Sequence, residues 1–438
     1  MFILLRIGSG AGFAGDRIEP AKALVEEAKL DYLILECLAE RTIALAQKQK
    51  RQNPELGYNE YLEERMRYLL PSLMNNKVRL ITNMGAANPI GAAKKILEIA
   101  HEMGLTCKVA AVTGDDVTEL LDFQGKKLEN NQSIDLFEPI ISANAYLGID
   151  ALLPALDTDA DIIVTGRVAD PSLFLAPIVH NYNWDVEDYD LIGKGTLIGH
   201  LLECAGQVTG GYFADPGKKD VPRLADLGFP FAIVEPDGKA IITKLPNAGG
   251  TVNLQTVKEQ LLYEVHDPKK YVTPDCIANF STAHLTEVAK DEVLVSGATG
   301  TKRPDQLKVS VGYHAGYLGE GEISYAGSTA LDRGKLAEDI VNERLKDRVT
   351  NMKADLIGVS SLHHGQFGHH HPYEVRLRVA SLCKTEEEAK IVGHEVEALY
   401  TNGPAGGGGA RKRVEIVIGI VSTLIDRSTI EIKTDILE

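Results

Sequence analysis

Cysteine is scarce in this chain of 438 residues, and none of its five cysteines stands in the Cys-x-x-Cys spacing of a zinc ribbon or redox pair. This scarcity excludes a disulfide framework and fits a reducing compartment, so we expect a cytoplasmic protein. No hydrophobic run reaches the length of a membrane-spanning helix, and the apolar residues 1–5 are too few for a signal peptide. Basic residues are also fewer than acidic ones: the chain has 46 Lys and Arg against 62 Asp and Glu, which gives a net charge of −16. That balance argues against nucleic acid and membranes as partners but not against an anionic small molecule.

What the chain does contain is an ordinary globular composition, with 44% hydrophobic and 25% charged residues. Its length predicts two domains. Strand-like and helix-like segments alternate through the first half, which is typical of βαβ units and of a parallel sheet with helices on both faces. After about Gly210 the pattern changes to shorter strands and turns, and residues 308–325 predict a hairpin that turns at residues 319–321. We therefore expect an α/β domain over residues 1–220 and an α+β domain over residues 221–438.

The most informative motif is TGRVADPS, which follows a short β-branched run at residues 161–165. Gly166 lets the chain turn off this strand, so Arg167 and Asp170 are expected in a loop at the carboxyl edge of a sheet. Open α/β proteins bind ligands at that edge. We expect Gly166 and Arg167 to bind an anionic substrate and Asp170 to transfer a proton. The alternative is an Arg–Asp pair that only braces the loop.

A glycine-rich loop, GSGAGFAGDR, directly follows the first predicted strand. Read from Gly10 it contains GxGxxG, and Glu36 closes the next strand near the position of a ribose-binding acid, so a dinucleotide site is a rival prediction. Pro20 places the start of the helix well after these glycines, which favours a loop that binds an anion or takes part in catalysis. A purely structural turn remains the third interpretation. The residues expected to act here are Gly10, Gly12 and Arg17 in substrate binding and Asp16 in catalysis.

Two further constellations offer polar groups at element ends. In TNMGAANP, Asn83 and Asn88 could bind the substrate, although Asn88 would also serve as a helix N-cap. His200 and Glu203 lie at i and i+3 of a predicted helix and could form an acid–base pair, or a buried pair that only stabilises the fold. Five histidines in residues 363–371 suggest a metal, but no carboxylate or cysteine is interleaved among them. We therefore expect no metal site and name no cofactor.

Taken together, GSGAGFAGDR, TNMGAANP, TGRVADPS, QVTGGYFADPG, GTKRPDQLKVSVGY and NGPAGGGGARKRVEI resemble the acyclic terpene utilisation (AtuA-like) family. The resemblance implies a role in the catabolism of branched acids or acyl-CoA thioesters, and a lyase role. We accordingly expect a carbon–carbon or carbon–oxygen lyase, or a hydratase. The rival hypotheses are a nucleotide-dependent enzyme that uses the loop of residues 8–15, and a non-catalytic subunit that needs a small partner protein. We also expect a homo-oligomer, with the second domain completing the site or mediating dimerisation.

Overall fold

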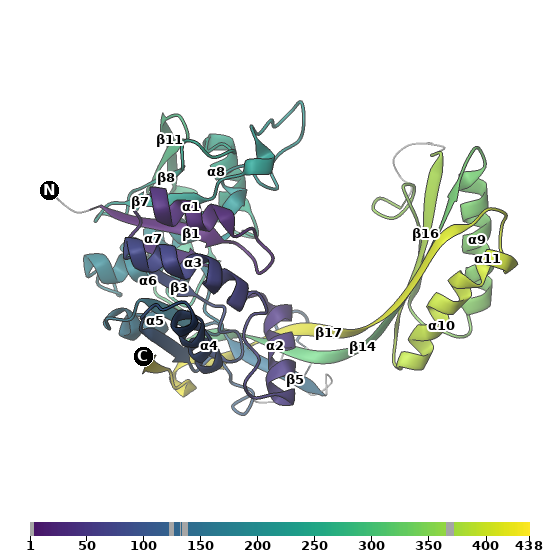
Figure 1. Cartoon of the computed structure of the whole chain (residues 1–438), viewed down its shortest axis with the longest axis horizontal. Coiled ribbons are helices and arrows are strands. Elements are labelled where there is room, and N and C mark those ends of the chain that lie inside the picture. Colours follow the sequence, from purple (N-terminus) through teal and green to yellow (C-terminus); the bar gives the residue numbers. More distant parts are fainter. Residues whose placement is uncertain (1–3, 122–126, 132, 134–138, 365–371) are drawn as a thin grey trace. The chain divides into compact units, whose positions relative to one another are not determined.

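The computed structural model describes residues 4–121, 127–131, 133, 139–364 and 372–438 (Figure 1). The chain divides into two compact units. Unit 1 comprises Met1–Leu136, Ile141–Gly312 and Ile420–Glu438, and unit 2 comprises Phe137–Ile140 and Tyr313–Gly419. These divisions differ from the predicted one at residue 220, because the chain continues past that point into strands that join the sheet of unit 1. Among the described residues, no helix is both long enough and apolar enough to cross a bilayer.

A ten-stranded sheet forms the centre of unit 1. Five adjacent strands pair in parallel, and antiparallel strands extend the sheet on both sides, four on one side and one on the other. The α/β class is thus confirmed, although the sheet is mixed and not purely parallel. In spatial order the strands are β11 (His284–Ala289), β12 (Glu292–Ser296), β8 (Ala240–Lys244), β7 (Pro230–Val234), β1 (Leu5–Ala11), β2 (Tyr32–Leu35), β3 (Arg79–Thr82), β6 (Ile162–Thr165), β4 (Val109–Thr113) and β18 (Lys433–Leu437).

Helices cover the parallel strands, which explains why those strands are hydrophobic along their whole length. Every residue of β2 and β6 is buried. Leu33 and Leu35 of β2 join one core cluster with α1, α3 and α4, whereas Ile34 faces the other way by the alternation of a strand. The helices are α1 (Glu19–Glu27), α2 (Glu40–Gln52), α3 (Leu62–Asn76), α4 (Pro89–Glu102), α5 (Ile149–Leu156), α6 (Asp170–Tyr182), α7 (Tyr189–Glu203) and α8 (Leu254–Leu262). A small sheet of β13 (Thr299–Thr301), β10 (Ile277–Asn279) and β9 (Tyr271–Val272) completes unit 1.

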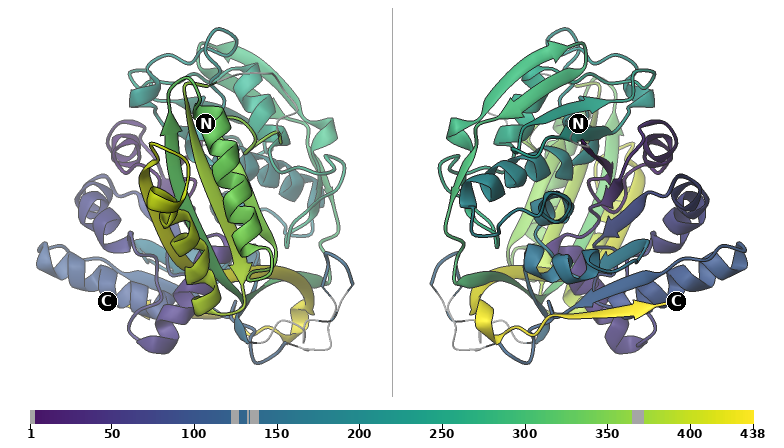
Figure 2. Two further views of the ribbon diagram at one scale, coloured as in Figure 1. Left: turned by 90° about the vertical axis from the view of Figure 1, so that its right-hand side faces the viewer. Right: turned by 90° about the vertical axis from the view of Figure 1, so that its left-hand side faces the viewer.

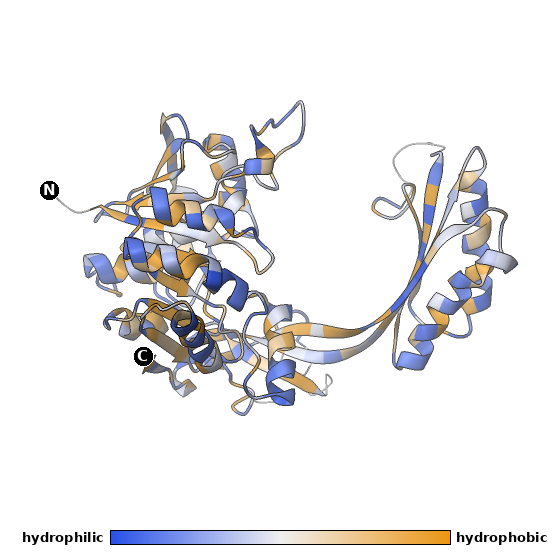
Figure 3. Cartoon of the chain, viewed as in Figure 1, coloured by the Kyte–Doolittle hydropathy of each residue, from blue (hydrophilic) through white to orange (hydrophobic). Residues whose placement is uncertain are grey.

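Unit 2 is an antiparallel sheet with helices on one face, and Figure 2 shows α9 and α10 side by side against its strands. Figure 3 shows hydrophobic and hydrophilic residues interspersed on both helices, as expected for helices with one buried side. Ile323, Leu377 and Val379 form part of the core beneath them. The elements that lie wholly in it are β15 (Met352–Ile357), β16 (Glu374–Cys383), α9 (Ala330–Leu345), α10 (Glu386–Glu397) and α11 (Leu399–Asn402). The long strands β14 (Gln306–Ala326) and β17 (Gly408–Asp426) belong partly to unit 2 and partly to unit 1. β5 (Ile140–Ala145) also pairs with β14.

The hairpin expected at residues 319–321 is wrong, because β14 runs through this position as one continuous strand. The two glycines serve close packing instead of a turn. A Cβ on Gly319 would lie 2.1 Å from the carbonyl oxygen of Ala389 in α10, and one on Gly321 would lie 2.7 Å from Val396. Glycine is therefore needed here so that the helix can approach the strand.

A buried carboxyl, Asp275, ties α5 and α6 to the turn between β9 and β10. Its oxygens accept hydrogen bonds from the Ile149 amide at 2.8 Å and the Ser172 hydroxyl at 2.5 Å. Burial raises the pKa of Asp275 to about 6. As pH rises, the unfolded chain therefore loses this proton before the folded protein does, and the contribution of Asp275 to stability falls between about pH 4 and 6.

Asp275→Asn should remove this pH dependence, because the amide can accept from Ile149 and donate to the Ser172 hydroxyl without ionising. Between pH 4 and 7, we expect the free energy of unfolding of the variant to rise by about 3 kcal/mol relative to that of the parent protein. Urea unfolding at several pH values measures this difference, with Asp435→Asn as an exposed control. Parallel pH curves for Asp275→Asn and the parent would contradict the account.

Candidate functional site

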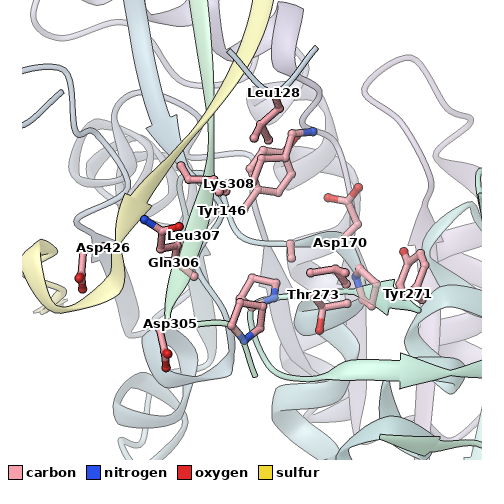
Figure 4. A pocket seen from close by; sticks show the side chains of 16 residues that line it. Leu128, Tyr146, Asp170, Tyr271, Thr273, Asp305, Gln306, Leu307, Lys308 and Asp426 are labelled. Carbon is pink, nitrogen blue, oxygen red and sulfur yellow. The ribbon is translucent and has the colours of Figure 1, made fainter. Parts of the chain in front are cut away.

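The site lies in unit 1, where the chain leaves the carboxyl ends of β1, β2 and β6. A pocket of about 820 Å3, called here the central cavity, is lined there by Asp16, Glu36 and Asp170 among others. A second pocket of about 850 Å3, the side cavity, adjoins it (Figure 4). The two cavities share four lining residues: Tyr146, Asp170, Tyr271 and Lys308.

Arg167 lies at the base of the central cavity and is almost wholly buried. Its Nε donates to the carbonyl of Val168 at 3.0 Å, Nη1 donates to the carbonyl of Leu38, and Nη2 donates to both Val168 and Asp170. The guanidinium carbon also lies 4.7 Å from the centre of the Tyr146 ring. All three guanidinium nitrogens thus contact protein acceptors, which is the bracing arrangement that the sequence left open as an alternative to anion binding.

Gly166 serves the turn before Arg167 and does not line either cavity. A Cβ on Gly166 would lie 2.3 Å from the carboxylate of Asp115. That carboxylate accepts hydrogen bonds from the Arg167 amide at 2.9 Å and from Asn144 Nδ2 at 2.8 Å. Burial raises the pKa of Asp115 to about 6. Glycine is needed at 166 so that this buried acceptor can reach the loop.

Glu36 and Asp170 are two carboxyl groups whose pKa values are raised within one cavity. Glu36 Oε1 accepts from the Leu38 amide and from Asn83 Nδ2, both at 2.9 Å, so Oε2 is the oxygen that a ligand can reach. Burial raises the pKa of Glu36 well above its usual range, and the charge of Asp170 adds to the rise. Burial also raises the pKa of Asp170, against the opposing effect of Arg167, although the Asp170 side chain is 37% exposed. Such a pair can hold and release protons nearer to neutral pH than free carboxyls can.

Asn83 therefore acts on the site through Glu36. It is fully buried, its Oδ1 accepts from the Cys37 amide at 2.7 Å, and its Nδ2 fixes the Glu36 carboxyl. Because Asn83 lines neither cavity, its place in the structure is that of a positioning residue behind the carboxyl.

A cluster of Glu40, Tyr146 and Lys308 was not identified from the sequence. The Tyr146 hydroxyl donates to Glu40 Oε1 at 2.5 Å, and Lys308 Nζ lies 3.3 Å from the same oxygen. Burial raises the pKa of Glu40, but the bond from Tyr146 and the positive charges of Lys308 and Arg167 outweigh it and bring the pKa to about 2. Glu40 is thus ionised. These residues are far apart in the chain and share no motif, so no local signal could have assembled them.

His200 and Glu203 do form the predicted pair, at the end of α7. Nδ1 of His200 lies 2.7 Å from Glu203 Oε1, and Nε2 lies 3.3 Å from the carbonyl of Leu261. A carbonyl can only accept, so Nε2 carries the hydrogen of that contact. Burial raises the pKa of Glu203 to about 7. Glu203 lines the central cavity, and its Oε2 has no hydrogen-bond partner among the described residues, whereas His200 is buried behind it.

In the glycine loop, a side chain of the loop itself accepts the hydrogen bonds of backbone amides. The Gly12 amide donates to Asp16 Oδ2 at 3.0 Å, and the Arg17 amide donates to Asp16 Oδ1 at 3.0 Å. Asp16 therefore holds the amide that a pyrophosphate would need in the dinucleotide hypothesis. A Cβ on Gly10 would lie 2.7 Å from Leu35, and one on Gly12 would lie 2.5 Å from the backbone of Cys204. Of these residues, Gly12 and Asp16 line the central cavity.

Arg17 and Asn88 lie outside the central cavity. Arg17 donates to the carbonyl of Ala225 and lies 3.5 Å from Glu19. Asn88 is the N-cap of α4, accepts from the Gly91 amide at 3.1 Å, and donates to the carbonyls of Pro54 and Leu56. These contacts make Asn88 a structural cap, one of the two roles considered for it.

The histidine-rich segment lies mostly outside the described residues. His363 and His364 belong to them, and the three later histidines do not. Within the described part of the chain, no three His, Cys, Asp or Glu side chains are grouped so as to hold a metal ion.

Comparison with known proteins places the chain by family alone. No curated protein and no solved structure matches it. The model of the family described as Acyclic terpene utilisation family protein AtuA matches residues 5–436, nearly the whole chain. The match spans the loops that carry Asp16, Glu36, Asp170 and Glu203. The chain therefore belongs to the acyclic terpene utilisation (AtuA) family.

Proposed function

We propose that the protein is a carbon–oxygen lyase or hydratase that adds water to, or removes it from, a branched acyl-CoA thioester. The observation that carries this proposal is the pair of Glu36 and Asp170. Both line one cavity and both have raised pKa values, but only Asp170 is paired with Arg167. Arg167 favours the charged form of Asp170, and Glu36 holds a proton. One base and one acid then face the same substrate.

In the direction of dehydration, Asp170 removes the proton from the carbon next to the thioester carbonyl. The carbon–oxygen bond at the following carbon breaks, and Glu36 gives its proton to the departing hydroxyl, which leaves as water. Hydration is the reverse, with Glu36 taking a proton from water and Asp170 returning one to carbon. Positioned acid–base groups of this kind accelerate such steps by about 10²–10⁴-fold.

Two other side chains of the central cavity can assist the reaction, one by stabilising negative charge on the substrate and one by binding water. Lys308 lines both cavities, and its ammonium can stabilise the negative charge that develops on the thioester oxygen. Glu203 lines the central cavity, and its buried Oε2 has no partner among the described residues, so a water molecule held beside it would satisfy this oxygen. His200 holds Glu203 in place through the contact of its Nδ1 with Oε1.

The charge of the central cavity favours a thioester over a free acid. A thioester carbonyl is uncharged, whereas a free carboxylate would be repelled by the acidic lining. The apolar part of the side cavity offers a place for a branched hydrocarbon chain. The carboxyl groups of the central cavity are Asp16, Glu36, Glu40, Asp170, Glu203 and Glu264, beside the cations Arg167 and Lys308. The apolar residues of the side cavity are Leu128, Ala169, Pro171, Val272, Pro274, Pro304, Leu307 and Leu424.

The test is to incubate the full chain with branched and straight 3-hydroxyacyl and 2-enoyl thioesters in deuterated water. Interconversion is followed by the absorbance of the conjugated thioester, and deuterium at the carbon next to the carbonyl by mass spectrometry. With branched thioesters, we expect addition or loss of water and incorporation of deuterium at the carbon next to the carbonyl. Shortened thioesters would indicate the carbon–carbon lyase expected as the other reaction class. Binding without exchange or cleavage would overturn the proposal and favour a non-catalytic subunit that needs a partner protein.

A further inference from the structure

A third pocket, of about 610 Å3, lies beside the loop that carries Asp16. It is lined by the loop after β1, the start of α1 and the start of α3, and is called here the α1–α3 pocket. Asp16 lines both this pocket and the central cavity, so the two adjoin. None of the proposed acid–base steps uses it.

A buried and incompletely paired arginine borders the α1–α3 pocket. Arg65 is only 1% exposed, and its Nη2 donates to the carbonyls of Ala14 at 3.2 Å and Asp16 at 2.6 Å. Its Nε and Nη1 have no hydrogen-bond partner among the described residues. Buried N–H groups of a guanidinium are costly to leave unpaired, so this side chain points to an anionic ligand in the pocket that it lines.

Two helix N-termini converge on the same pocket. The N-caps Ile18 of α1 and Tyr61 of α3 both line it, and neither makes a side-chain capping bond in the described part of the chain. The positive end of a helix favours an anion. Arg17 and Arg67 add exposed cations. Each is paired with a glutamate, at 3.5 Å and 2.7 Å, but ion pairs between such exposed side chains are weak and exchange readily.

Two aromatic rings also line the pocket. Tyr61 and Tyr68 line the pocket and are 38% and 40% exposed. Lys22 Nζ lies 5.0 Å from the centre of the Tyr68 ring. Exposed aromatic rings next to basic side chains suit a nucleobase that carries phosphates, because the base can stack and the phosphates can pair.

We propose that the α1–α3 pocket binds the phosphorylated adenosine end of the acyl-CoA substrate. The inference rests on the proposed function, since it names where the anionic end of that thioester lies. The central cavity sets six carboxyl groups against two cations, Arg167 and Lys308, and would repel phosphates. The adjoining pocket balances Asp16, Glu19 and Glu64 with Arg17, Arg65 and Arg67, and two helix N-termini add to its positive side. The reacting thioester and the charged end then occupy two pockets that share Asp16.

Isothermal titration calorimetry of the full chain with adenosine 3′,5′-bisphosphate tests this assignment without requiring turnover. We expect binding, weakened about tenfold or more by Arg17→Ala and by Tyr68→Ala, both at exposed positions that spare the fold. Arg51→Ala, an exposed arginine of α2 that does not line the pocket, is the matched control and should bind as the parent does. Asp170→Asn should also leave this binding unchanged, because Asp170 lies in the other cavity.

The outcomes separate this inference from the proposed function. Bisphosphate binding that depends on Arg17 and Tyr68 in a protein without hydratase activity would support the pocket and overturn the reaction. Hydratase activity together with no bisphosphate binding, or with binding unaffected by both variants, would overturn the pocket. Inorganic phosphate that binds as tightly as the bisphosphate would overturn the nucleotide assignment.

Discussion

Asp170→Asn is expected to lower kcat/KM for dehydration of a branched 3-hydroxyacyl thioester by about 10²–10⁴-fold. Asparagine keeps the size of the side chain and can still accept the hydrogen bond from Arg167, but it cannot take a proton from carbon. The α-deuteration of substrate in deuterated water should fall by a similar factor. Binding of the thioester, followed by thermal shift, should change much less.

The pH profile gives a sharper form of the same prediction. Asp170 must be ionised and Glu36 protonated, so activity should rise with pH as Asp170 loses its proton and fall as Glu36 loses its own. Burial raises both pKa values, which moves this window toward neutral pH. Glu36→Gln should abolish the fall at high pH together with most of the activity, whereas Asp305→Asn, an exposed side-cavity aspartate, should leave the profile intact. An unchanged rate in Asp170→Asn would rule out its role as the base.

Arg167→Met should destabilise the folded protein by about 3–5 kcal/mol. The substitution removes the donors to the carbonyls of Leu38 and Val168 and the countercharge of Asp170, and all of these groups stay in or beside the cavity wall. Arg167→Lys should recover part of the loss, because lysine restores the charge but not the planar set of donors. Urea unfolding without ligand measures both changes.

Arg17→Ala is the matched control, since the Arg17 side chain is 48% exposed and its partners are at the surface. We expect a change of less than about 0.5 kcal/mol. If Arg167→Met kept the stability of the parent and lost only affinity for substrate, Arg167 would be a ligand-binding residue, as its sequence context first indicated. A large loss of stability with unchanged affinity of the remaining folded protein would support the bracing role.

Local signals in the sequence were enough to predict the α/β class. β-branched runs such as residues 161–165 alternate with helical segments, and parallel strands covered on both faces must be hydrophobic throughout. Since parallel strands share one direction, the loops after β1, β2 and β6 had to meet at one edge. Asp16, Glu36 and Asp170 follow these strands in the chain, so their order along it already indicates that they lie in one region. The i, i+3 spacing of His200 and Glu203 likewise predicted their contact.

Tertiary structure alone decided which atoms those side chains face. A sequence gives the presence of a guanidinium at Arg167 but not whether its donors point to a ligand or to the carbonyls of Leu38 and Val168. It also could not bring Glu40, Tyr146 and Lys308 together, because contacts across more than a hundred residues depend on how the whole sheet is assembled. Two boundaries between the units, after residues 312 and 419, likewise depend on the tertiary structure. They fall within the long strands β14 and β17 and not in loops. The order of the strands and the burial of each carboxyl arise only when the chain is packed, and burial shifts the pKa of each carboxyl. The periodicity of helices and strands, in contrast, is a property of the sequence itself.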